Sequence, residues 1–226
     1  MLAEVIGEIL PLGLAVGLSP FPLIATVLLL LSERAHLSGP LFLVGWVAGT
    51  IIAVTSFTLL SAALERSDPS DQGWFEGVGQ IVIGTVLLVL AARKWQKFLT
   101  GTAAELPGWM ASITAASPGR SLALGLGLST VNPKNLLVAA AAGLTLGSAY
   151  LETSAVLIGI GSYTLLASVT VILPVLVHGL WPARSTNALR ALESWLTANS
   201  TALMALLLTI FGVVVLGNGI GALQPT

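Results

Sequence analysis

Six long apolar segments dominate this sequence. They cover residues 5–31, 37–64, 74–92, 121–149, 151–177 and 201–220. A helix needs about 20 mostly apolar residues to cross a hydrocarbon core roughly 30 Å thick, and each segment reaches or approaches that length. The apolar residues run continuously and do not alternate with polar ones, which favours helices over the short strands of a membrane barrel. The segments predict an all-α, polytopic membrane protein with six transmembrane helices.

The composition excludes several classes of protein. Of the 226 residues, 8% are charged and 55% are hydrophobic, whereas a soluble domain carries about 25% charged residues. A soluble enzyme, a secreted module and a disordered chain are therefore excluded. The net charge of −1 provides no basic field for nucleic acid. There is no cysteine, and His36 and His178 lie in no metal-binding pattern, so we expect no metal, no cofactor and no catalytic triad.

The loop cations predict the orientation. With six spans, the loops after the first, third and fifth spans share one side of the membrane, and the termini share the other side with the remaining loops. The termini side has only Arg66. The opposite side has seven cations: Arg34, Arg93, Lys94, Lys97, Arg120, Arg184 and Arg190. Because cytoplasmic loops are rich in lysine and arginine, we expect both termini to be extracytoplasmic.

An internal repeat divides the single membrane domain, residues 1–226. Gly17-Leu18-Ser19 recurs as Gly127-Leu128-Ser129, at an offset of 110 residues, and a proline follows each copy. We expect a first three-helix half at residues 1–93, a cytoplasmic interfacial linker at 94–120 and a second three-helix half at 121–226. Three spans are an odd number, so the second half enters the membrane from the opposite side. The prediction is a 3+3 inverted repeat.

The first helix of each half is expected to be broken. Proline lacks an amide hydrogen and pushes the preceding residue out of helical geometry. Pro20 and Pro22 disrupt the first segment, and Asn132-Pro133 disrupts the fourth. Freed backbone groups are tolerated in lipid only where protein or water satisfies them. Interrupted spans at matching places in two halves indicate a transport site near the midplane.

Lys134 is the most informative single residue. It lies in the middle of the fourth segment, where a lysine costs roughly 2.5–3.5 kcal/mol on insertion scales. One interpretation is a structural clamp on the carbonyls of a broken helix; the other is a group that faces an anion. No aspartate or glutamate lies deep in a segment, which argues against a dedicated cation exporter. The pattern favours a substrate with an anionic or hydroxyl-rich head.

Two further patterns concern packing. Glycines four residues apart let helices approach closely. The pairs are Gly13/Gly17, Gly45/Gly49 and Gly143/Gly147, and they predict packing within the bundle or between the protomers of a homodimer. Residues 94–117 and 181–200 read as segments at the cytoplasmic lipid interface. They serve as membrane anchors or, alternatively, as a gate over a transport path.

The sequence resembles the LysE superfamily of small bacterial exporters. The resemblance rests on Ser19-Pro20-Phe21-Pro22 and Asn132-Pro133-Lys134-Asn135. Leu18-Ser19-Pro20, the run at residues 28–32 and Arg34-Ala35 are most similar to its glycolipid-addressing (GAP) or sulfolipid-addressing (Sap) branch. The resemblance implies a protein of the bacterial plasma membrane that moves peptidoglycolipids or sulfolipids outward. It also implies a substrate site on the asparagine–proline–lysine–asparagine motif, with Ser19, Pro20 and Pro22 opposite.

The functional expectation is an exporter of a glycolipid or related amphiphile that works by alternating access. Two alternatives remain. One is an exporter of small polar solutes, such as amino acids or ions, which a closed and water-filled central cavity would favour; a side opening wide enough for acyl chains would favour lipid. The other is a scaffold that transports nothing itself and docks a larger lipid-export machine. The sequence assigns neither the substrate nor the energy source.

Overall fold

The computed structural model describes residues 2–67, 74–100, 113 and 116–223. In this part of the chain there are eight α helices and no strand, which confirms the all-α prediction. The helices are α1 (Leu2–Gly17), α2 (Pro20–Leu30), α3 (Ala35–Ser67), α4 (Trp74–Leu99), α5 (Pro118–Thr130), α6 (Pro133–Ser148), α7 (Thr153–Leu180) and α8 (Pro182–Ala222).

Four single helices are long and apolar enough to cross a membrane, within α3, α4, α7 and α8. The pair α1 and α2, bent by 50° at its break, makes a fifth candidate. Helices α5 and α6 have 13 and 16 residues, which corresponds to about 20 Å and 24 Å at 1.5 Å per residue. Neither can cross alone, and the pair is not among the candidates. The membrane character is therefore clear, and the sixth span stays a prediction.

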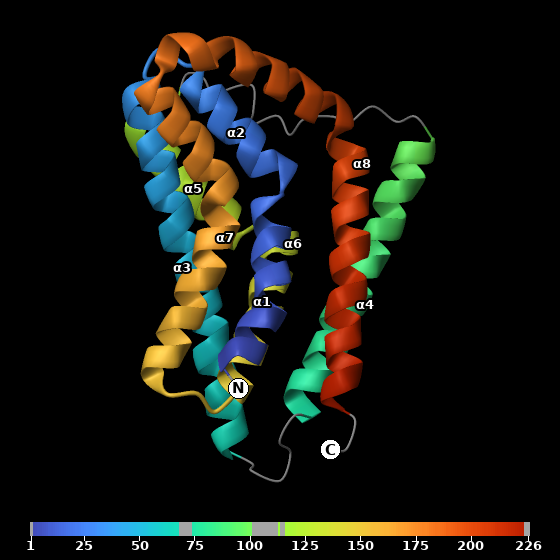
Figure 1. Ribbon diagram of the computed structural model, residues 1–226. Helices are drawn as coiled ribbons and strands as arrows, with labels where there is room; N and C mark the ends of the chain where they lie inside the picture. Colours follow the sequence, from blue (N-terminus) through green and yellow to red (C-terminus); the bar gives the residue numbers. More distant parts are fainter. Residues whose placement is uncertain (1, 68–73, 101–112, 114–115, 224–226) are drawn as a thin grey trace.

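Two helices extend beyond the predicted segments. Helix α4 continues to Leu99, because the run after residue 92 is rich in strong helix formers and contains neither glycine nor proline before Gly101. Helix α8 joins residues 182–200 to the last predicted span without a break. Its first part runs across one end of the bundle before the helix turns and descends beside α4 (Figure 1). Of the expected linker at 94–120, residues 101–112, 114 and 115 lie outside the described residues.

The apolar face of the first part of α8 packs on α2. Leu189 is buried in a cluster with Val27 and Leu30 of α2, and Leu196 is buried with Ile24 of the same helix. The amphipathic pattern of this segment is thus used for contacts inside the protein. These contacts place it directly over the second half of the first broken helix.

The glycine pairs pack within the bundle, which is one of the two arrangements that the sequence predicts. A Cβ on Gly45 would lie 2.1 Å from the carbonyl oxygen of Leu122 on α5, and one on Gly17 would lie 2.5 Å from that of Leu166 on α7. Gly147 approaches α3 equally closely, with 2.6 Å to the carbonyl oxygen of Thr58. The broken helices α1, α5 and α6 therefore lie backbone to backbone against α7 and α3.

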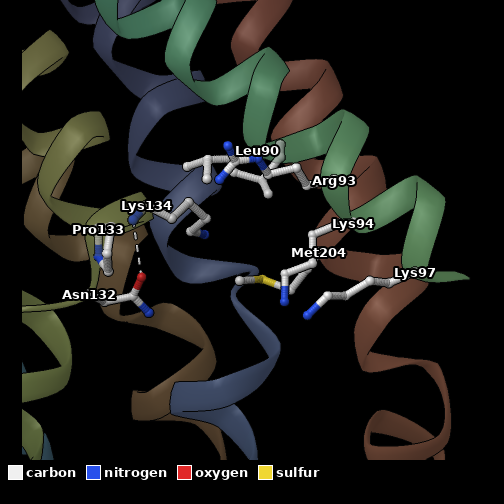
Figure 2. A pocket seen from close by; sticks show the side chains of 9 residues that line it. Leu90, Arg93, Lys94, Lys97, Asn132, Pro133, Lys134 and Met204 are labelled. Carbon is white, nitrogen blue, oxygen red and sulfur yellow. Dashed lines mark hydrogen bonds between the residues drawn. The ribbon is translucent and has the colours of Figure 1, made fainter. Parts of the chain in front are cut away.

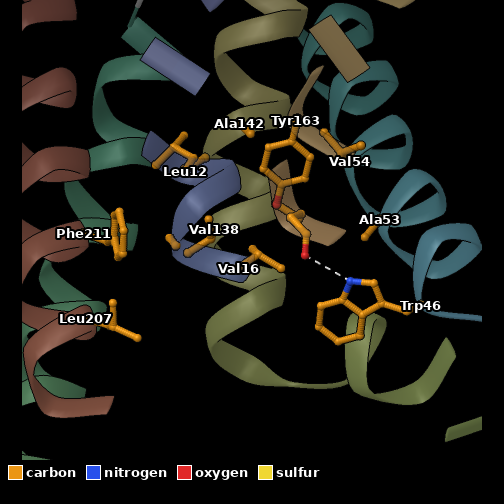
Figure 3. Packing of buried hydrophobic residues seen from close by; sticks show 14 of the residues in the cluster. Leu12, Val16, Trp46, Ala53, Val54, Val138, Ala142, Tyr163, Leu207 and Phe211 are labelled. Carbon is orange, nitrogen blue, oxygen red and sulfur yellow. Dashed lines mark hydrogen bonds between the residues drawn. The ribbon is translucent and has the colours of Figure 1, made fainter. Parts of the chain in front are cut away.

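A buried tryptophan of α3 is hydrogen-bonded to α7 within the core (Figure 3). Trp46 and Tyr163 are both 0% exposed. The indole nitrogen of Trp46 donates a hydrogen bond to the carbonyl oxygen of Ala167, with a separation of 3.1 Å. This contact fixes the two long helices that flank the broken ones.

The glycine contacts give a stability prediction. Gly45→Ala forces α3 and α5 apart, because no backbone atom at 2.1 Å from a Cβ can stay in place, and overpacking of this kind costs about 1–3 kcal/mol. Gly161→Ala is the matched control, since nothing lies within 4 Å of a Cβ at that position. Thermal unfolding in detergent should show a lower melting temperature for Gly45→Ala alone. Equal melting temperatures for the two variants would contradict the close approach.

Candidate functional site

Both expected helix breaks are present. Helix α1 ends at Gly17 and α2 begins at Pro20; α5 ends at Thr130 and α6 begins at Pro133. The residue before each proline, Ser19 or Asn132, is an N-cap with extended backbone geometry. A proline forces that geometry on its predecessor and is itself well placed at the first helical position. The two breaks are therefore built in the same way.

Pro22 does not produce a second interruption, contrary to the expectation that it disrupts the same turn as Pro20. It lies in the first turn of α2, where an amide hydrogen would have no partner inside the helix in any case. Pro11, Pro40 and Pro174 also lie inside helices. Proline alone therefore does not determine where this chain breaks.

The carbonyl groups at the end of α1 are satisfied partly by the connection that follows and partly by other helices. Two of the last four accept hydrogen bonds from backbone amides of the connection. The other two, on Ala15 and Gly17, accept from the Nζ of Lys134 on α6 and the hydroxyl of Thr170 on α7. The first break thus faces the bundle interior, as predicted, because its donors come from helices of the second half.

The second break is closed mainly by its own asparagines. The side-chain oxygen of Asn132 accepts from the backbone amide of Lys134 at 3.1 Å, and the side-chain nitrogen of Asn135 donates to the carbonyl oxygen of Leu128 at 3.1 Å. Two oxygens next to the breaks, Ser19 Oγ and Asn135 Oδ1, are buried and have no hydrogen-bond partner among the described residues.

Lys134 is 4% exposed. Its hydrogen bond to Ala15 is the contact that the clamp interpretation requires, and it crosses from the second half of the chain to the first. An ammonium group has three donor hydrogens, and the described part of the chain offers this one a single acceptor. The clamp therefore leaves Lys134 with donors for a ligand.

Lys134 also lines a cavity of about 350 Å³, which we call the cationic cavity (Figure 2). Helices α4, α6 and α8 form it, and its lining consists of Leu90, Arg93, Lys94, Lys97, Asn132, Pro133, Lys134, Met204 and Leu208. Sequence reasoning named only Asn132, Pro133 and Lys134 among these nine residues. It missed the other three cations, Arg93, Lys94 and Lys97, because it counted them as loop cations. The helix-forming run after residue 92 was a signal that α4 continues past the apolar segment. This continuation places the three cations next to α6.

A second cavity adjoins the first, and we call it the apolar groove. It has a volume of about 520 Å³ and lies between α2, α5 and the start of α6. Its lining is Phe21, Ala123, Leu124, Gly127, Leu128, Val131, Asn132 and Pro133. Asn132 and Pro133 line both cavities, so the N-cap of α6 separates a strongly charged space from an apolar one.

Of the seven predicted site residues, Asn132, Pro133 and Lys134 line these cavities. The other four, Ser19, Pro20, Pro22 and Asn135, are buried at the breaks and line neither of the two. The structure brings the two breaks together through Lys134. Contact of any of the seven with a substrate stays a prediction.

The comparison with known families agrees with this arrangement. The family described as Sap, sulfolipid-1-addressing protein, matches residues 9–221. The chain belongs to this family. The Sap branch of the expected resemblance is thereby confirmed. The match extends from within α1 to within α8 and includes both breaks. No curated protein and no solved structure matches the chain. In this Sap-family protein, the cationic cavity and the apolar groove are the candidate functional site.

The contacts of Lys134 predict how its removal changes the thermal stability of the protein. Lys134→Met removes a buried charge whose desolvation costs several kcal/mol, and it leaves the carbonyl of Ala15 without its donor, which costs about 1–3 kcal/mol. We therefore expect the variant to melt at the same temperature as the wild type or higher. Thr170→Val is the matched comparison, because it removes the donor to Gly17 without removing a charge, and it should lower the melting temperature.

Thermal unfolding of the two variants in detergent measures this difference. A Lys134→Met protein that is clearly less stable than the wild type, to the same extent as Thr170→Val, would contradict this expectation and show that the bond from Lys134 to Ala15 outweighs its desolvation cost.

Proposed function

We propose that this Sap-family protein exports a glycolipid or related amphiphile across the bacterial plasma membrane, by alternating access around its two helix breaks. The observation that carries the proposal is the meeting of the cationic cavity and the apolar groove at Asn132 and Pro133. An amphiphile has a polar head and an apolar chain, and the two adjoining cavities supply one environment for each.

The apolar groove favours lipid over a small polar solute. All of its lining side chains except that of Asn132 are apolar. Val131, at its edge, is 74% exposed, so the groove borders the outer surface of the bundle. A side opening with an apolar lining suits an acyl chain that enters from the bilayer. An amino acid or an ion would need polar partners along the whole path.

A six-span 3+3 inverted repeat accounts for the helix contacts. In this proposal α1–α2 corresponds to α5–α6, α3 to α7, and α4 to α8. Helix α1 packs along α7 and α5 along α3; α8 contacts α2 and α4 contacts α6; α4 and α8 pack on each other. Each of these contacts thus has its counterpart under the exchange. The broken pair α5–α6 then forms the sixth span. In the same proposal, the family belongs to the wider LysE superfamily.

The charges support an orientation with the termini outside. Both termini lie at the same end of the bundle (Figure 1). That end holds Glu8 and Glu76, which line a third cavity of about 480 Å³ with Ser148. The opposite end holds Arg34, between α2 and α3, and the first turns of α5 and α8 with Arg120 and Arg184. By the positive-inside rule, the basic end faces the cytoplasm, and the passenger leaves toward the acidic end.

The bond from Lys134 to Ala15 suggests how loading couples to movement. It joins α6 of the second half to α1 of the first. An oxygen atom of the passenger head would replace the Ala15 carbonyl as the acceptor of this bond. The two halves would then lose one of their direct links and could rock around the breaks. Lys134 holds the head, Asn132 and Pro133 separate head from chain, and the groove guides the chain.

Gly127 provides the test of the groove. Nothing lies within 4 Å of a Cβ at this position, so Gly127→Leu can fill groove space without displacing the backbone. Excluding two methylene groups of the lipid chain from the groove costs about 1.6 kcal/mol, which corresponds to roughly a tenfold loss of affinity. We expect transbilayer exchange of fluorescent galactosylceramide, measured in proteoliposomes by dithionite quenching, to slow about tenfold or more in Gly127→Leu. Gly161→Leu, on α7, is the control and should exchange at the wild-type rate.

The same assay separates the alternatives. Equal exchange by Gly127→Leu and Gly161→Leu would exclude the groove as the lipid path. A wild-type protein that exchanges a fluorescent amino acid and no lipid would favour the solute exporter. A wild-type protein that moves neither would favour a scaffold for a larger export machine.

A further inference from the structure

Four cations meet at the cationic cavity, and among the described residues no carboxylate lines it. Arg93, Lys94 and Lys97 come from α4, and Lys134 comes from α6, about 40 residues further along the chain. None of the four forms an ion pair with a carboxylate in the described part of the chain. Like charges gathered in one cavity repel each other, and an anion between them would remove this cost.

The geometry of α4 directs its three cations to one place. Arg93 and Lys97 are four residues apart and Lys94 and Lys97 three apart, which places them on neighbouring positions of one helix face. They occupy the last turns of α4, where the negative end of the helix dipole stabilises cations. Figure 2 shows their side chains and that of Lys134 around the same space.

The rest of the lining strengthens the attraction for an anion. Leu90, Met204 and Leu208 form the apolar part of the wall, and electrostatic attraction is stronger next to a low-dielectric wall than in open water. The first turn of α6 adds the partial positive charge of a helix N-terminus. Lys134, at 4% exposure, is the deepest of the four cations.

These observations identify a class of ligand. We propose that the cationic cavity binds a tetrahedral oxyanion: a sulfate or phosphate monoester. Such a group has three terminal oxygens to share among four cations, and the guanidinium of Arg93 suits two of them at once. The volume of about 350 Å³ is at the lower end for small-molecule pockets, and it accommodates the oxyanion with the sugar or alcohol that carries it.

The apolar groove indicates where the oxyanion comes from. It shares Asn132 and Pro133 with the cationic cavity, so a ligand in both spaces carries its anionic group next to an apolar chain. This step rests on the proposed export of an amphiphile; binding of the oxyanion itself does not. A lipid head and a free inorganic anion share the same chemistry at the four cations, and the test distinguishes them.

The experiment compares two glycolipids that differ in one group. Galactosylceramide is neutral, and sulfatide is the same lipid with a sulfate ester on the sugar. Native mass spectrometry of the full-length protein in detergent measures the binding of each, with inorganic sulfate and inorganic phosphate as competitors. We expect sulfatide to bind wild-type protein about tenfold more tightly than galactosylceramide.

The variants locate the site. Lys97 and Arg93 are exposed, so Lys97→Gln and Arg93→Gln should fold normally. Each should reduce the preference for sulfatide several-fold, and the double variant should abolish it. Arg120→Gln is the matched control, because Arg120 is an exposed cation on α5 that does not line the cavity, and it should retain the full preference.

The outcomes distinguish a lipid-borne oxyanion from a free anion, and oxyanion binding from lipid export. A preference for sulfatide that inorganic anions do not remove supports a lipid-borne oxyanion; saturable competition by sulfate or phosphate supports the same site with a free anion as its ligand. Equal binding of the two lipids with no inorganic anion bound, or equal loss in Lys97→Gln and Arg120→Gln, overturns the inference. Equal binding of both lipids, together with their transbilayer exchange, would end this inference and leave lipid export intact. Sulfatide binding without any lipid exchange would do the reverse.

Discussion

Every backbone polar group inside a bilayer needs a partner within the protein, and this constraint organises the whole structure. Helix α1 stops at Gly17, and its last carbonyls require donors. The chain supplies them from helices that lie far away in sequence, through Lys134 on α6 and Thr170 on α7. The end of the first broken helix is therefore partly satisfied by the second half of the chain. A buried lysine, costly in itself, is thereby part of the fold and available to a ligand.

The close approach of the helices follows from the same constraint. A hydroxyl on α7 can reach Gly17 only because glycine brings the backbone of α1 against Leu166. At the second break the N-cap Asn132 closes the first turn of α6 and at the same time separates the two cavities. Structural closure and ligand binding thus use the same few residues. An exporter that rocks around the breaks would exchange these internal bonds for bonds to its passenger.

Much of this arrangement could be predicted from the sequence, because its causes are local. Proline after a residue that caps a helix fixes both breaks, and a lysine in the middle of an apolar segment has to find a partner inside. The glycine pairs indicated close helix packing, because their spacing of four residues is also a local feature of the sequence. Pro22 was misjudged, because a proline in a first helical turn interrupts nothing. The sequence could not show which contacts the first part of α8 makes, since Leu189 and Leu196 pack on residues far away in the chain.

The candidate site was only half predictable. Asn132, Pro133 and Lys134 stand together in the sequence. Arg93 and Lys97 come beside them only because α4 continues past the apolar segment and packs against α6. The apolar groove has no sequence signature at all, since its lining residues resemble those of any membrane helix. A site that depends on how helices pack becomes visible only in three dimensions.

The most direct test of the central claim, that the two cavities form one site for an amphiphile, uses the absence of cysteine from the chain. Single cysteines at Leu90 in the cationic cavity and Leu124 in the apolar groove can be labelled with a maleimide in nanodiscs, with Gly179→Cys as the control. The account predicts that added sulfatide slows labelling at both cavity positions and leaves the control unchanged. Protection at only one of the two, or equal labelling at all three positions with and without lipid, would contradict it.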